Sequence, residues 1–477
     1  MSFVSLQFPI FFLVVCLVLG LLPKKARWAW LVAASCWFYM AFIPAYILIL
    51  FVLIAVDYSA GLWIEKSQGA KRKWILIGSL ITNVAMLAAF KYLNFALENV
   101  NEVFQSTGIG SLAWRFPWVL PIGLSFHTFQ SMAYTIEVYK GKQKAERHLG
   151  IYSLYVLYFP QMVAGPIERP QNLLVHLREP SGFTWIGVID GLKLMAWGLF
   201  KKVLVADRLA VYVDSVYANP NGHSGWEVLI ASYFFAFQIY CDFSGYTDIA
   251  RGAARVMGTR LMLNFNHPYI SRSPAEFWHR WHISLSTWFR DYLFFPLGGS
   301  RGALWATCRN LFIVFIVSGF WHGAAWTFLA WGAIHGLFMV VQKLLEQSKS
   351  FVGASAKMGS TGAGRLLQML FTFHLVTFAW IFFRAKSMSD ALDSIRQIVS
   401  MGSWADLGAA FANPAARAGV LVMALLVAIE WAHRRWHMPT YLAARPWYVR
   451  WLLWYGLLTA TLLYGRFGNE QFLYFQF

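Results

Sequence analysis

Long apolar segments separated by short polar ones follow one another along the whole chain. A helix needs about 20 mostly apolar residues to cross the roughly 30 Å hydrocarbon core of a bilayer, and within lipid it must pair its own backbone polar groups. Apolar runs lie at roughly 5–22, 28–43, 46–64, 74–93, 118–138, 150–167, 184–200, 227–247, 309–342, 366–384, 416–432 and 448–465. The pattern predicts an all-α, polytopic integral membrane protein with about eleven spanning helices in a lipid bilayer.

Two of these runs are interrupted by residues that break helices. The run 118–138 contains Pro121 and Gly123, and the run 150–167 ends in a Gly-Pro pair. Such breaks are tolerated at membrane depth only where protein or a wet cavity receives the freed backbone groups. We therefore expect re-entrant segments beside the spanning helices.

The chain shows no internal repeat and one compositional change. We expect a single membrane-embedded domain over 1–477, with N-terminal spans at 1–120, a motif-bearing core at 121–342 and C-terminal spans at 366–477. The stretch 350–364 is rich in Gly and Ser, which predicts a flexible loop.

The distribution of charged residues indicates the orientation of the chain in the membrane and does not indicate a binding partner. The chain is 58% hydrophobic and 13% charged with a net charge of +18, and its Lys and Arg gather in short loops between apolar runs. This is the positive-inside pattern, so nucleic acid is not an expected partner. The spacing of the four cysteines indicates neither a disulfide framework nor a zinc site. They are Cys16, Cys36, Cys241 and Cys308.

Three basic loops fall on one side of the membrane. The loops at 24–27, 66–73 and 140–147 are separated from each other by pairs of apolar runs, which places them all in the cytoplasm and the N-terminus outside it. The first apolar run lacks a basic region before it and a cleavage site after it, so we interpret it as a retained span. The arginine-rich stretch 251–310 is also expected in the cytoplasm.

The segment 273–294 has the signals of an amphipathic helix. Ser273 is a predicted N-cap, and Glu276 completes a capping box. A helix continuing to Phe294 places its Trp and Phe side chains on one face and His282 at the margin of that face. An interfacial helix with a tryptophan belt fits the same pattern. A metal site using His279 and His282, which are three residues apart, with His267 upstream is a weaker alternative, because no carboxylate or Cys completes a familiar spacing.

Histidines within apolar runs are the other candidates for chemistry. His322 lies in the segment SGFWHGAAW at 318–326, where an ionisable group is costly and therefore a functional candidate; a neutral His bonded to a carbonyl is the alternative. His335 would lie about 20 Å from His322 along a continuous helix, so the two can share a site only if the helix breaks. For His127, in the broken run 118–138, packing is favoured over chemistry.

Intramembrane carboxylates need partners. Asp242 and Asp248 end an apolar run, and Arg251 and Arg255 follow closely in sequence. We expect structural ion pairs at a cavity mouth, although steering of an anionic donor is also compatible. Glu168, with the adjacent Arg169, has the same two interpretations. Nucleotide-binding, heme and nucleophile-elbow motifs are absent.

These motifs resemble the bacterial branch of the membrane-bound O-acyltransferases, which includes alginate and other polysaccharide O-acetyltransferases. The matching segments are PIGLSF (121–126), FPQMVAGPI (159–167), YCDFSGYTD (240–248), NFNHPY (264–269), FWHRWHISLSTWFRDY (277–292), PLGG (296–299), SGFWHG (318–323), FAWIFFR (378–384) and YFQF (474–477). The resemblance implies a helical shell around a central tunnel. It also implies that His322 is the family's central histidine and that His282 holds the second His or Asn position.

The resemblance further implies a reaction. Acetyl-CoA would enter from the cytoplasm as a substrate, with no permanently bound cofactor and no metal, and acetyl would leave toward an extracytoplasmic, alginate-like polysaccharide or a periplasmic or secreted acetyltransferase. His322 would act as base or relay and His282 would orient the donor or polarise its carbonyl, although an acetyl-His intermediate is an alternative. Residues assigned to the donor mouth are Arg280, Ser286, Arg290 and Asp291. Residues assigned to the tunnel lining are His127, Asp242, Asp248 and His335.

Other functions remain open at this stage. The same family includes enzymes that transfer D-alanyl groups to teichoic acid and acetyl groups to peptidoglycan. A non-enzymatic transporter would share the composition, but it predicts paired broken helices in two related halves, which the sequence does not show. The expected location is the bacterial inner membrane.

Overall fold

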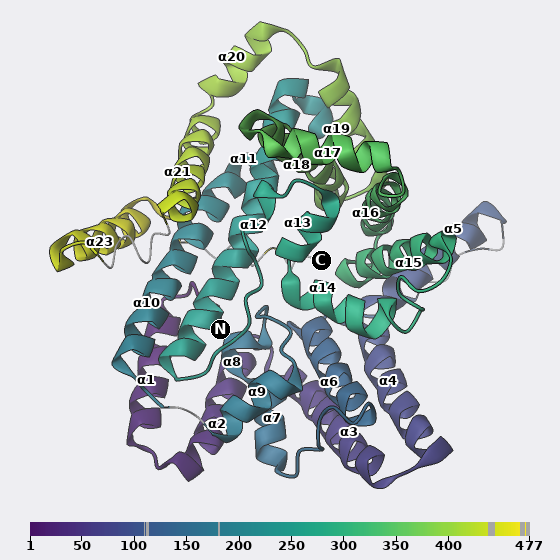
Figure 1. Ribbon diagram of the computed structural model, residues 1–477, viewed down its shortest axis with the longest axis vertical. Helices are drawn as coiled ribbons and strands as arrows, with labels where there is room; N and C mark the ends of the chain where they lie inside the picture. Colours follow the sequence, from purple (N-terminus) through teal and green to yellow (C-terminus); the bar gives the residue numbers. More distant parts are fainter. Residues whose placement is uncertain (109, 111–113, 180–181, 437–443, 468–472, 474–477) are drawn as a thin grey trace. The chain divides into compact units, whose positions relative to one another are not determined.

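The chain is built from helices (Figure 1), and its structure, a computed structural model, describes residues 1–477 except 109, 111–113, 180–181, 437–443, 468–472 and 474–477. The terminal YFQF motif therefore lies outside the described residues. The described residues contain no strand. They form two compact units: unit 1 contains Met1–Leu192 and Ala250–Met262, and unit 2 contains Lys193–Ile249 and Leu263–Phe477.

Unit 1 contains the N-terminal helices. They are α1 (Gln7–Leu21), η1 (Lys24–Ala26), α2 (Arg27–Met40), η2 (Pro44–Tyr46), α3 (Ile47–Lys66), α4 (Gly69–Lys91), α5 (Leu93–Ser106), α6 (Leu124–Tyr139), α7 (Leu149–Leu157), α8 (Phe159–Met162) and α9 (Pro170–Arg178). Two further helices, α10 (Trp185–Leu199) and α12 (Gly225–Val256), each have residues in both units.

Unit 2 contains the remaining helices. They are the π-helix η3 (Phe200–Ala206), α11 (Asp207–Ala218), η4 (Pro220–Gly222), η5 (Pro268–Ile270), α13 (Pro274–Arg280), α14 (Ile283–Phe289), the π-helix η6 (Arg290–Phe294), α15 (Leu304–His322), α16 (Trp326–Leu345), α17 (Lys349–Ser360), α18 (Gly362–Arg384), α19 (Met388–Ser400), α20 (Trp404–Ala412), α21 (Pro414–Trp436) and α23 (Trp447–Tyr464).

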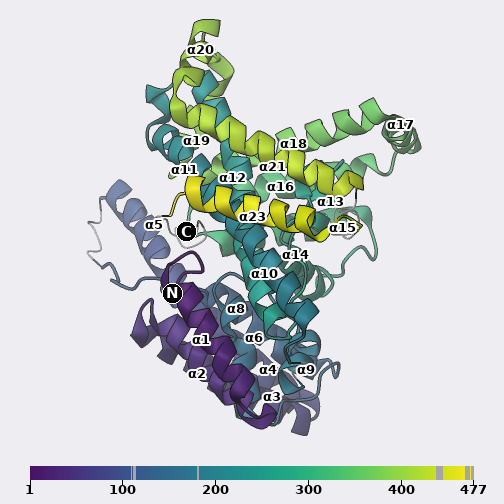
Figure 2. The same cartoon turned by 90° about the vertical axis from the view of Figure 1, so that its left-hand side faces the viewer.

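The all-α, polytopic membrane fold is confirmed. Seven helical segments among the described residues are long and apolar enough to cross a membrane: Pro44–Lys66, Gly69–Lys91, Gly225–Val256, Leu304–His322, Trp326–Leu345, Gly362–Arg384 and Pro414–His433. The shorter helix α1 is also apolar and lies beside α2 (Figure 2). In the two broken runs the chain forms α6, which starts at Leu124, and the short helices α7 and α8.

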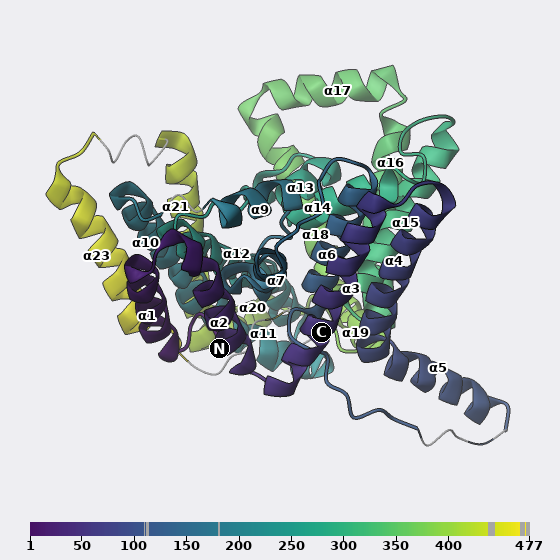
Figure 3. The ribbon, with the colours of Figure 1, turned by 90° about the horizontal axis from the view of Figure 1, so that it is seen from below.

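Helices α3, α4 and α6 pack side by side in unit 1 (Figure 3). A Cβ atom added to Gly61 of α3 would lie 2.7 Å from the ring of Tyr134 on α6, so the glycine permits this close approach. The buried carboxylate of Asp57 accepts hydrogen bonds from Ser79 Oγ at 2.6 Å and from Asn83 Nδ2 at 2.9 and 3.0 Å. The buried carboxylate on α3 is thus satisfied by side chains of α4.

One sequence-based expectation about local structure is wrong. The stretch 350–364 is not a loop: it forms most of α17 and the start of α18, and α17 projects from its neighbours (Figure 3). The hydroxyl of Ser348 caps α17 by accepting a hydrogen bond from the Phe351 N–H at 3.3 Å. The apolar run 309–342 divides into two helices, α15 and α16, at Gly323.

Candidate functional site

Helices α15 and α16 form a hairpin in which two backbones nearly touch. A Cβ atom on Gly319 would lie 2.3 Å from the carbonyl oxygen of Phe328, and one on Gly332 would lie 2.4 Å from that of Phe315. Only residues without a side chain permit this spacing. The hairpin brings His322, the last residue of α15, next to the side chains of α16.

His322 is surrounded by aromatic rings. Its imidazole centroid lies 4.9 Å from Trp321, 4.9 Å from Trp331 and 5.5 Å from Phe383, and the residue is 5% exposed. Such a ring environment excludes bulk water and leaves an imidazole as the main polar group at the end of α15. The sequence-based placement of His322 in an apolar setting is consistent with this geometry.

His335 belongs to the same aromatic cluster. Its ring centroid lies 5.0 Å from that of Trp331, and its Nδ1 accepts a hydrogen bond from Trp278 Nε1 at 3.3 Å. The chain breaks between α15 and α16, as a site shared by the two histidines requires. His322 and His335 both contact the indole of Trp331. The bond from Trp278 indicates a packing role for at least one nitrogen of His335.

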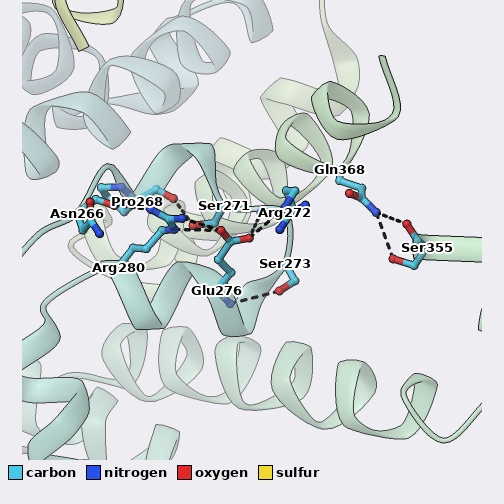
Figure 4. A network of polar contacts seen from close by, with 9 residues as sticks. All are labelled: Asn266, Pro268, Ser271, Arg272, Ser273, Glu276, Arg280, Ser355 and Gln368. Carbon is cyan, nitrogen blue, oxygen red and sulfur yellow. Dashed lines mark hydrogen bonds and ion pairs between the residues drawn. The ribbon is translucent and has the colours of Figure 1, made fainter. Parts of the chain in front are cut away.

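The predicted helix 273–294 is interrupted. The Ser273 N-cap is confirmed, since its hydroxyl accepts from the Glu276 N–H at 3.2 Å, whereas the Glu276 carboxylate bonds to the Arg272 N–H (Figure 4). Helix α13 ends at Arg280, Trp281 is extended, and His282 has φ 43° in the left-handed region before α14 begins. The expected position of His282 at the margin of a continuous amphipathic helix is therefore wrong: its side chain is fully buried.

A neighbouring loop causes this interruption. The Ile283 N–H donates to the Asn264 carbonyl at 2.9 Å, and Asn264 Oδ1 accepts from the Ser284 N–H at 3.1 Å and from Ser284 Oγ at 2.9 Å. These tertiary bonds replace helical ones. Left-handed backbone at a non-glycine residue costs about 1–3 kcal/mol, and it persists only where surrounding contacts enforce it, often at functional sites.

Asn264 also fixes the protonation pattern of His282. A backbone N–H can only donate, so the amide atom facing Ser284 is the oxygen, and this oxygen lies 3.2 Å from His282 Nδ1. Nδ1 therefore carries the hydrogen, and Nε2 of the neutral ring has the lone pair. Burial lowers the pKa of His282 to about 3, which keeps the ring neutral at physiological pH.

The indole of Trp321 lies next to both histidines. Its centroid is 6.4 Å from the ring of His282 and 4.9 Å from the ring of His322. The ring of Phe243 lies 4.7 Å from that of His282. Unit 2 thus brings His282, His322 and His335 into one aromatic cluster, although they come from three separate segments of the chain.

Asp242 and Asp248 pair with buried lysines that the sequence analysis missed. Lys201 Nζ lies 2.5 Å from Asp248, and Lys202 Nζ lies 2.5 Å from Asp242 and 2.6 Å from Asp207. The expected partners Arg251 and Arg255 belong to unit 1, where Arg255 pairs with Asp190 at 3.0 Å. The signal for the lysines was available, because a Lys-Lys pair interrupts the apolar sequence after Phe200.

The residues assigned to the donor mouth make local contacts. Arg280 binds Glu276 at 2.9 Å and donates to the Asn266 carbonyl at 3.1 Å (Figure 4). Ser286 Oγ donates to the Trp281 carbonyl at 3.2 Å, and the side chains of Arg290 and Asp291 pair at 2.8 Å. Their role toward a donor stays a prediction.

His127 and Glu168 are placed in unit 1. The ring of His127 is buried against Tyr39 with a centroid distance of 6.3 Å. Glu168 accepts hydrogen bonds from the Met262 N–H at 2.6 Å and from Asn172 at 2.5 Å. Burial raises the pKa of Glu168 to about 7.

The histidines considered for metal binding have separate partners. His279 Nδ1 lies 3.2 Å from the Ala275 carbonyl, and His267 Nδ1 lies 3.4 Å from Glu430. Among the residues that the structure describes, no three His, Cys, Asp or Glu side chains gather closely enough to hold a metal ion.

Comparison with known proteins gives the same class as the motifs. The model of the membrane-bound O-acyltransferase family matches residues 148–385. The "Probable alginate O-acetylase AlgI" of Pseudomonas aeruginosa is 38% identical over 364 residues, which cover 75% of this chain and 66% of the relative. The protein of the same name from Azotobacter vinelandii is 36% identical over 82% of this chain and 77% of its own length. The "Peptidoglycan O-acetyltransferase" of Helicobacter pylori is 34% identical over 78% and 73%, respectively.

The fold and the buried histidine cluster define a multi-pass helical membrane enzyme. The chain belongs to the membrane-bound O-acyltransferase family, so its enzyme class is acyltransferase.

Proposed function

We propose that this protein transfers acetyl from cytoplasmic acetyl-CoA across the inner membrane to an alginate-like polysaccharide, directly or through a periplasmic or secreted acetyltransferase. The placement of His322 and His282 next to the same indole, that of Trp321, is the observation that supports this most strongly. The names of the relatives favour polymer O-acetylation. We favour alginate as the polymer because the relatives named as alginate O-acetylases are more similar to this chain than the peptidoglycan O-acetyltransferase is.

The chemistry requires a base near a thioester. His322 takes the proton from the attacking hydroxyl as the new C–O bond forms at the acetyl carbonyl. The C–S bond then breaks, and the imidazolium returns the proton to the leaving thiolate of coenzyme A. General-base catalysis of this kind contributes about 10²–10⁴-fold to the rate.

His282 has a more limited role than the sequence suggested. With its hydrogen on Nδ1 and directed at Asn264, its Nε2 can accept but not donate a hydrogen bond. Polarising a carbonyl needs a hydrogen-bond donor. The tautomer of His282 therefore favours a role in orienting the acyl donor or the hydroxyl of the acceptor. The residues assigned to the donor mouth, with Asp242 and Asp248, remain parts of this proposal, whereas His127 and His335 are assigned to packing.

A sidedness assay tests the proposal. The full chain is reconstituted into proteoliposomes with its N-terminus on the lumenal side, labelled acetyl-CoA is added outside, and oligomannuronate inside serves as acceptor. We expect labelled ester in the lumen. Transfer only from a D-alanyl carrier protein would contradict the proposal and favour a D-alanyl transferase. Uptake of intact acetyl-CoA into the lumen without ester formation would contradict it and favour a transporter. If the assay requires a second protein from the periplasm, the acceptor is that partner.

A further inference from the structure

A cavity of about 430 Å³ lies within unit 1, and none of its lining residues belongs to the histidine cluster of unit 2. It is lined by the end of α1, the loop before α2, and residues of α7 and α9. The volume is within the range of small-molecule sites, about 300–1,000 Å³. The proposed reaction does not use this cavity.

The polar lining of this cavity carries a net positive charge. Four cationic side chains, Lys24, Lys25, Arg27 and Arg178, face a single acid, Glu146, which gives 4 − 1 = +3 with histidines neutral. Lys24 and Lys25 are exposed, and among the described residues their side chains have no ion-pair partner. Uncompensated cations at a cavity rim attract an anion.

The single acid does not oppose an anion, because both of its oxygens are engaged. Glu146 Oε2 pairs with Arg178 at 2.6 Å, and its Oε1 accepts from the His148 N–H at 2.9 Å. The carboxylate is also buried. Its charge is therefore compensated within unit 1, and the lysines and Arg27 remain to bind a ligand.

His148 adds a directional donor. Its Nδ1 accepts from the Ile151 N–H at 3.2 Å, so the neutral ring carries its hydrogen on Nε2. Trp28 holds the ring in an edge contact at 4.7 Å between centroids. An N–H donor beside ammonium and guanidinium groups suits a phosphate oxygen.

The cavity also has an apolar lining. It includes Leu19, Leu31, Ile151, Leu177 and Phe183. The adjoining helix α1 has exposed leucines, with Leu17 and Leu21 at 59% and 86% exposure, as expected of a surface that faces hydrocarbon. A ligand with both a phosphate and an apolar portion matches this combination, and basic pockets between membrane helices on the cytoplasmic side bind anionic head groups.

We propose that this cavity binds the phosphate of an anionic amphiphile at the cytoplasmic membrane surface. Two sources share this chemistry: an anionic phospholipid of the bilayer and an acyl-coenzyme A. The cytoplasmic placement rests on the orientation given by the basic loops.

Native mass spectrometry of the full chain in detergent distinguishes these sources. The protein is titrated separately with phosphatidylglycerol, phosphatidylcholine and palmitoyl-coenzyme A. We expect one phosphatidylglycerol or one palmitoyl-coenzyme A to bind about tenfold more tightly than phosphatidylcholine, and the arm that binds identifies the source. Equal binding of the anionic and zwitterionic lipids, with no binding of the thioester, would overturn the proposal.

Charge-matched variants locate the site. The double variant Lys24→Gln/Lys25→Gln should weaken binding about tenfold, whereas Lys71→Gln/Lys73→Gln, which removes the same charge from another basic segment of unit 1, should not. Lys24→Arg/Lys25→Arg should retain binding. Equal losses in the two glutamine variants would show a general surface effect and refute the site. Because no acetyl transfer is measured, failure here is separate from failure of the proposed reaction.

Discussion

Replacement of Asn264 by alanine tests how the fold controls His282. Asn264 Oδ1 accepts from Ser284 N–H and Oγ and lies 3.2 Å from His282 Nδ1. In the alanine variant the Ser284 N–H and Oγ–H lose their acceptor, and His282 Nδ1 keeps the 3.5 Å contact with Ser284 Oγ. Each stranded donor costs about 1–3 kcal/mol, so we expect a stability loss of about 2–6 kcal/mol.

The catalytic consequence is separate from the stability loss. Without Asn264 the proton of His282 is no longer restricted to Nδ1, and the left-handed conformation at residue 282 loses two of its supporting bonds. We therefore expect acetyl transfer per folded molecule to fall at least about tenfold. Ser284→Ala, which removes only the hydroxyl, should lose about 1 kcal/mol and retain more activity.

Thermal unfolding in detergent and transfer of labelled acetyl, measured on the same preparations, separate the two effects. The matched control is Asn83→Ala, which removes a fully buried amide that donates to Asp57 in unit 1. This control should lower stability without lowering transfer per folded molecule. If Asn264→Ala were as active as Asn83→Ala, our account of the His282 tautomer would be refuted.

Three other perturbations have defined outcomes. Gly332→Ala places a Cβ atom 2.4 Å from the Phe315 carbonyl oxygen, so thermal unfolding should show a stability loss of about 1–3 kcal/mol. Gly353→Ala should cause no such loss, because Gly353 has open space around it. The pKa of Glu168 is raised to about 7 from 4.5, so this residue stabilises the fold below pH 4.5 and loses that contribution as the pH rises through 7, a change of about 3 kcal/mol for 2.5 units. Glu168→Gln should remove this part of the pH dependence of unfolding, and an unchanged pH profile would contradict the raised pKa. Lys202→Met strands two buried aspartates and should cost about 3–5 kcal/mol, so near-normal unfolding would show that the pairs are dispensable.

The membrane fold was predictable because its signal is local. Apolar length and loop charge indicate spanning helices regardless of how those helices pack. The α15–α16 hairpin had a partial signal as well, since Gly319 and Gly323 flank Trp321-His322. The composition of 350–364 misled because glycine content alone does not exclude a helix that also has alanine, lysine and a serine cap.

The break at His282 was not predictable from the segment itself. No Gly or Pro interrupts 275–294, and the helical periodicity correctly identified a buried face that includes Phe277, Trp281 and Leu285. The break arises from tertiary hydrogen bonds to Asn264, which lies 18 residues earlier. The lysine partners of Asp242 and Asp248 are equally nonlocal, because Lys202 lies 40 residues from Asp242 and Lys201 lies 47 residues from Asp248.

The most direct test of the central claim compares two histidines of one cluster. His322 and His335 both contact Trp331, at 4.9 and 5.0 Å between centroids, so their alanine variants disturb the same packing. In proteoliposomes supplied with labelled acetyl-CoA, His322→Ala should reduce the rate of ester formation at least about 100-fold, while His335→Ala should lower stability and retain most of the rate per folded molecule. Wild-type transfer by folded His322→Ala would contradict the role of His322 as base or relay.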